Sequence, residues 1–138
     1  MLPDGGQGFG AMLIGLRASL DAARDFDAEV LRRLAELRFL ATTLCAAAAA
    51  PQADPALPHA VADDFLRATA LVLLAWAWAQ IDATDGADTP RWRLPARALR
   101  ERILPELDLR TRLVRLQFAT PVSGNAGATG GAPSGPAH

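Results

Sequence analysis

The sequence predicts an all-α protein, an antiparallel up-down four-helix bundle followed by a disordered C-terminal tail. Hydrophobic residues make up 51% of its 138 residues, and much of that share is alanine, which favours helix over sheet. Large apolar residues recur at steps of three and four in four successive stretches, as they do on one face of a helix. No stretch alternates as a strand does, and no internal repeat predicts a solenoid.

The first predicted helix runs from about residue 7 to residue 22. The Pro3-Asp4-Gly5-Gly6 run before it is typical of a turn. Within the helix the larger apolar residues form one stripe that would face the core, namely Phe9, Met12, Leu13, Leu16 and Leu20.

The second predicted helix begins near Asp25 and Asp27, because carboxylates stabilise a helix N-terminus. It continues through an alanine run and ends at the proline-containing connection of residues 51–58. Glu29 and Arg33 are four residues apart and so are spaced to interact on the helix surface. The core stripe consists of Val30, Leu34, Leu37, Ala41 and Leu44.

The third predicted helix spans about residues 59–83, with Asp63 and Asp64 in its first turn. It is apolar on nearly all sides, which predicts a central position in the bundle. Its most apolar stretch, residues 68–79, is well short of the roughly 20 residues that cross a bilayer. Its core stripe consists of Val61, Phe65, Ala68, Val72, Trp76 and Ala79.

After a polar turn at residues 82–90, a fourth helix is predicted from Trp92 or Pro95 to Gln117. Pro105 removes one backbone donor inside it and crowds the preceding turn, so we expect a kink or break between two helical pieces. The apolar positions of this helix are Leu99, Ile103, Leu107, Leu113 and Leu116.

These four predicted helices form a single domain that spans residues 1–118. Residues 119–138 are rich in Gly, Ala, Pro, Ser and Thr and have almost no large apolar side chain. Such a segment cannot offset the entropy of ordering itself, which predicts a disordered tail.

Charge and cysteine content restrict the class of protein. The net charge is −1 and no nucleic-acid-binding motif is present, so we expect no nucleic-acid partner. The charge is nevertheless uneven, since residues 1–66 hold nine acids and five arginines whereas residues 91–138 hold eight arginines and three acids. The lone Cys45 allows no internal disulfide and is compatible with a reducing compartment. With no secretory signal pattern, we expect a cytoplasmic protein without a membrane span.

The sequence offers no familiar constellation for catalysis. His59 lies beside a proline-rich loop and His138 ends the tail, so neither has a partner for a metal site or a triad. Cys45 follows Leu44 and precedes five alanines, apolar surroundings that favour a structural role over that of a nucleophile.

A metal site is equally unsupported by the sequence. The bundle lacks the Glu-x-x-His motifs of a carboxylate-bridged di-metal centre. Asp82, Asp85 and Asp88 with Gly86 resemble a calcium loop only faintly, because their spacing and the missing closing glutamate do not fit an EF-hand. We interpret them as a solvated turn.

Partner surfaces are the functional features that the sequence does indicate. Arg93, Arg97 and Arg100 are spaced to form a basic stripe for an acidic partner or for phosphates, with ordinary solvated helix surface as the alternative. Trp76 and Trp78 are two residues apart and point to different sides of their helix, so one would be core and the other would meet a partner. These five residues form the predicted interface.

Asp64-Phe65-Leu66-Arg67, Ala75-Trp76-Ala77-Trp78 and the stretch of residues 98–106 ending in Ile103-Leu104-Pro105-Glu106 resemble the C-terminal accessory helical domain of bacterial acyl-CoA dehydrogenases. The opening Leu2-Pro3-Asp4-Gly5-Gly6 is similar to the first segment of that domain. The resemblance covers about residues 2–118 and rests on spaced apolar and small residues. The chain departs from the pattern in its short polar turn and its arginine-rich, tyrosine-free fourth helix.

The resemblance implies a noncatalytic accessory domain that packs against the flavin-containing core of an oxidoreductase of fatty acid metabolism. In that family FAD, the acyl-CoA pocket and the catalytic glutamate belong to the preceding domains, so no catalytic, cofactor-binding or metal-binding residue is assigned to this chain. The chain begins near the boundary of that domain, which would indicate a separated gene product, a truncated gene or a missed upstream start.

Two other hypotheses follow from the residues themselves. One is an independent helical interaction or oligomerisation module, in which an apolar strip on the third or fourth helix pairs with a second copy. The other, an enzyme with an unrecognised active site, has no supporting constellation of acids, histidines and cysteine.

Overall fold

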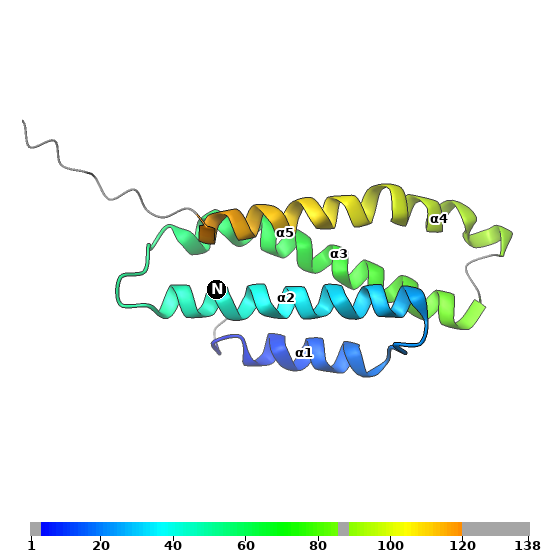
Figure 1. Cartoon of the computed structure of the whole chain (residues 1–138), viewed down its shortest axis with the longest axis horizontal. Helices are drawn as coiled ribbons and strands as arrows, with labels where there is room; N and C mark the ends of the chain where they lie inside the picture. The colour runs from blue at the N-terminus through cyan, green and yellow to red at the C-terminus, as the bar shows by residue number, and fades with distance from the viewer. Residues whose placement is uncertain (1–3, 86–88, 120–138) are drawn as a thin grey trace, which may run out of the picture.

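The computed structural model describes residues 4–85 and 89–119, without the side chains of residues 85 and 119. These residues form the predicted antiparallel bundle, with α1 (Gln7–Ala18), α2 (Asp25–Ala49) and α3 (Leu57–Asp85) as its first three helices. The fourth is composite and consists of η1 (Pro90–Trp92), α4 (Arg93–Ala98), η2 (Leu99–Ile103) and α5 (Leu104–Ala119). The predicted tail, apart from Ala119 at the end of α5, lies outside the described residues. Figure 1 shows the composite helix alongside α3, and α1 alongside α2.

The start of α1 depends on a side chain outside the helix. Gly6 has φ 90°, a left-handed conformation that glycine adopts without steric cost. This turn brings the Asp4 carboxylate over the helix end, where it accepts hydrogen bonds from the backbone N–H groups of Gly6 (3.0 Å) and Gly8 (2.6 Å). The hydrogen bond from Gly8 is the largest influence that lowers the pKa of Asp4. Asp4 therefore satisfies donors that the helix itself leaves free.

The end of α1 comes four residues before the predicted Ala22. Ser19 closes the helix, because its backbone N–H and its hydroxyl both bond the Leu16 carbonyl, at 3.3 and 2.7 Å. Leu20 still packs partly buried against the core from outside the helix. The prediction that Leu20 packs against the core was therefore correct, whereas the prediction that Leu20 lies within the first helix was wrong.

The composite helix is irregular next to Pro105, where a kink or break was predicted. Instead of a break, η2 is a π-helical turn that ends just before α5, and the backbone N–H of Leu104 bonds the Leu99 carbonyl five residues back. Pro105 is the second residue of α5 and follows this wider turn directly. The wider turn thus accommodates the proline while the helix continues.

The main core lies between α2, α3 and α5, with α1 resting on α2. Its buried members include Leu34, Leu37, Val72 and Leu107, and α3 makes its most extensive contacts with α5 and then with α2. Two predicted core positions are wrong: Met12 is 38% exposed and Leu116 is 51% exposed. A second buried cluster joins the ends of α3 and the composite helix, formed by Trp78, Ala96 and Leu99.

Candidate interaction surfaces

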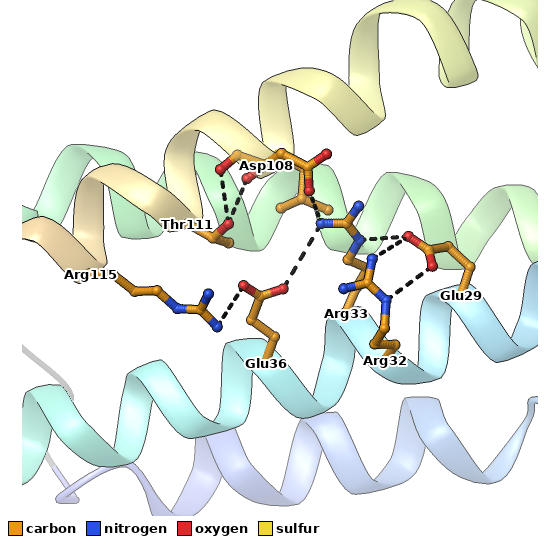
Figure 2. Close-up of polar contacts among 8 residues, drawn as sticks. Glu29, Arg32, Arg33, Glu36, Asp108, Thr111 and Arg115 are labelled. Atoms are coloured by element: carbon orange, nitrogen blue, oxygen red, sulfur yellow. Dashed lines mark hydrogen bonds and ion pairs between the residues drawn. The ribbon is translucent and has the colours of Figure 1, made fainter.

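A buried arginine joins α2 to α5. The Arg33 side chain is 6% exposed, and its Nε donates to Glu29 Oε1 at 2.8 Å while its Nη1 donates to Asp108. Nη1 also lies 3.9 Å from Glu36 Oε2. Figure 2 shows the guanidinium between carboxylates of both helices. Burial by itself would lower the pKa of Arg33, and the hydrogen bonds to Asp108 and Glu29 outweigh it, so the net shift is upward.

Two more arginines extend this network in opposite directions along the bundle (Figure 2). Arg32 binds Glu29 through Nε at 3.1 Å and Nη2 at 2.8 Å, and this hydrogen bonding is the main cause that lowers the pKa of Glu29. Arg115 of α5 reaches Glu36 of α2, with 2.9 Å between Nη2 and Oε1. The pairs of Arg33 with Asp108 and of Arg115 with Glu36 therefore join α2 to α5 over about two turns.

A second set of ion pairs joins α3 to α5. Arg67 donates from Nε and Nη2 to the two oxygens of Glu106, at 2.8 and 3.3 Å, and this hydrogen bonding lowers the pKa of Glu106. Arg110 Nη1 donates to Asp64 Oδ1 at 2.7 Å. Most arginines in the middle of the bundle thus form ion pairs within the chain.

The arginines of residues 91–102, which we call the basic segment, are arranged differently. Arg97 pairs with Glu101 on its own helix, with 2.8 Å between Nε and Oε1. Arg93, Arg100 and Arg102 are exposed and have no ion pair within the part of the chain that the structure describes. The fifth member, Arg91, lies over a tryptophan ring. Positive charge is therefore left unbalanced along this segment.

Trp76 and Trp78 point to different sides of α3, and each contacts another helix or loop of the same protein. Trp78 is buried, and its ring meets the ring of Trp92 edge-on, with centroids 5.8 Å apart. Arg91 lies 4.8 Å from the Trp92 ring centre, within the range of a cation–π contact. Trp76 is half-buried, and its Nε1 donates to the Ser19 hydroxyl at 2.9 Å. Trp78 and Trp92 thus anchor the basic segment to α3.

An open apolar groove of about 500 Å³ lies between α1 and α3. Phe9 and Phe65 approach each other with ring centroids 5.6 Å apart, and Leu44 and Cys45 of α2 also line the groove. On its α3 side the lining residues follow helical spacing, namely Pro58, Ala62, Leu66, Thr69 and Leu73. The sequence analysis did not identify this groove, because it arises where α1 and α3 are loosely packed.

The other titratable candidates remain apart from one another. Cys45 is half-buried and His59 is exposed. Asp82 lies within α3 and not in a turn as predicted, and it pairs with Arg24, the residue before α2, at 3.3 Å. His138, Gly86, Asp88 and the side chain of Asp85 lie outside the described residues.

Residues 4–85 and 89–119 contain no group of three His, Cys, Asp or Glu side chains placed to hold a metal ion. None of the helices they form has both the length and the apolar character to cross a membrane.

Comparison with known proteins adds no relative. No model of a known protein family matches the chain, and neither a curated protein nor a solved structure is significantly similar to it. The resemblance to the accessory domain of acyl-CoA dehydrogenases stays a prediction.

Proposed function

We propose that this protein is a noncatalytic helical module that binds an acidic surface of another protein through the basic segment. The gathering of unpaired arginines within residues 91–102 carries the proposal, because the other exposed arginines without an ion pair among the described residues are scattered over α1, α2 and α5. Arg33, Arg67 and Arg110 pair with carboxylates of neighbouring helices. Arg93 and Arg100 have no such partner among the described residues. Exposed cations left without carboxylates attract an acidic surface and direct its approach.

An exposed leucine adds an apolar contact to this surface. Leu94 is 77% exposed and lies within α4, next to Arg93 and one turn from Arg97. Arginine is among the side chains that contribute most at interface centres, and apolar neighbours such as Leu94 help to exclude water from them. The contact between the Trp78 and Trp92 rings holds the start of the segment against α3.

The resemblance implies the identity of the partner, a flavin-containing core like that of an acyl-CoA dehydrogenase. Two of the segments that resemble this family support this finer proposal. Residues 98–106 include the end of the basic segment, and residues 75–78 lie in α3, against which the basic segment packs. FAD would belong to that core, and this chain would supply packing surface. The proposal includes a cytoplasmic location, with which a single cysteine is compatible.

A capture experiment with charge-reversed variants tests the proposal. The full chain, tagged and expressed in its native host, is captured, and co-purifying proteins are identified by intact mass and by flavin absorbance. Capture of a flavoprotein should fail for the triple variant Arg93→Glu, Arg97→Glu, Arg100→Glu. A matched control reverses three other exposed arginines without ion pairs among the described residues, Arg17, Arg38 and Arg112.

The outcomes separate the parts of the proposal. Loss of a flavoprotein only in the basic-segment variant supports both the surface and the partner. Loss of a different acidic protein supports the surface and rejects the flavoprotein core. Equal capture by both variants rejects the basic segment as the binding surface, and turnover of acyl-CoA by the purified chain alone would reject a noncatalytic role.

A further inference from the structure

We draw no further inference here: the strongest candidate, the open apolar groove between α1 and α3 that Phe9, Phe65 and Leu66 line, has nothing in the structure that shows what covers it.

Discussion

At the scale of single residues, one buried cation organises the contact between α2 and α5. Arg33 has a side chain that is 6% exposed and three carboxylates around it. A buried pair gives little net stability over an apolar substitute, yet removing one partner leaves the other charges without compensation. Truncation of Arg33 should therefore lower the free energy of unfolding by far more than the net stability that the intact ion pairs provide.

We predict that Arg33→Ala lowers the free energy of unfolding by about 2–3 kcal/mol, less than for a fully buried pair because Glu29 and Asp108 keep contact with water. The neighbouring Arg32→Ala should cost less than about 1 kcal/mol, since that side chain is 60% exposed. Urea unfolding followed by circular dichroism measures both. Equal losses for the two variants would show that burial of Arg33 has no energetic consequence.

The lowered pKa values of Glu29 and Glu106 predict a loss of stability in acid. Hydrogen bonding from Arg32 lowers the first and hydrogen bonding from Arg67 lowers the second, both from an ordinary value of 4.5. In the unfolded chain these groups bind protons at a higher pH than in the folded chain. Their contribution is thus fully present above the ordinary value and is lost as the pH falls through the lowered folded values.

Urea unfolding at a series of pH values checks this prediction. The free energy of unfolding should be level near neutral pH and fall between about pH 5 and about pH 3. Glu29→Gln should begin less stable at neutral pH and lose less over the acid range. An unchanged acid slope in that variant would assign the pH dependence to other carboxylates.

At the scale of elements, α1 is the weakest helix of the bundle. It has 12 residues, one of which, Leu13, is buried. Gly10 and Gly15 lie inside it with no atom within 4 Å of the place that a Cβ would take. Glycine inside a helix destabilises it by about 0.5–1 kcal/mol relative to alanine. No packing contact in the structure explains these two glycines.

Gly10→Ala and Gly15→Ala should therefore each stabilise α1 by about 0.4–1 kcal/mol. Gly8→Ala is the contrasting variant, because its Cβ would lie 2.8 Å from the Asp4 carboxylate that caps the helix, and its gain should be smaller. Amide hydrogen exchange within α1 measures the effect. A loss of protection in Gly15→Ala would show that the position is less open than its surroundings indicate.

At the scale of the whole molecule, stability should be unequal among the helices. Core residues of α2, α3 and α5 are buried against one another, whereas α1 has grooves on both of its sides. Segments with few buried contacts open at lower free energy than the global unfolding. Amide exchange of the wild-type chain should thus show α1 opening before residues 68–79 of α3. Equal protection of the two would mean that α1 unfolds together with the core.

The sequence by itself determined the helices and the order in which they pack. Periodicity, Asp27 at the start of α2 and the prolines of residues 51–58 are local signals, and helix formation responds to local signals. Pro105 predicted an irregularity at the right place for the same reason. Its form, a π-helical turn rather than a break, was decided by continued packing of Leu99 and Leu107 against α3.

Only the tertiary structure decided which charges pair and which apolar residues stay exposed. Glu29 and Arg33 are spaced for contact in the sequence, whereas Asp108 lies 75 residues from Arg33 and reaches it only through the packing of α5 on α2. Likewise, a helix that is apolar on nearly all sides predicts a central position, yet α3 leaves Leu66 and Leu74 exposed because none of the helices that the structure describes covers that face. Pairing and exposure depend on residues that meet only after folding, so no local pattern specifies them.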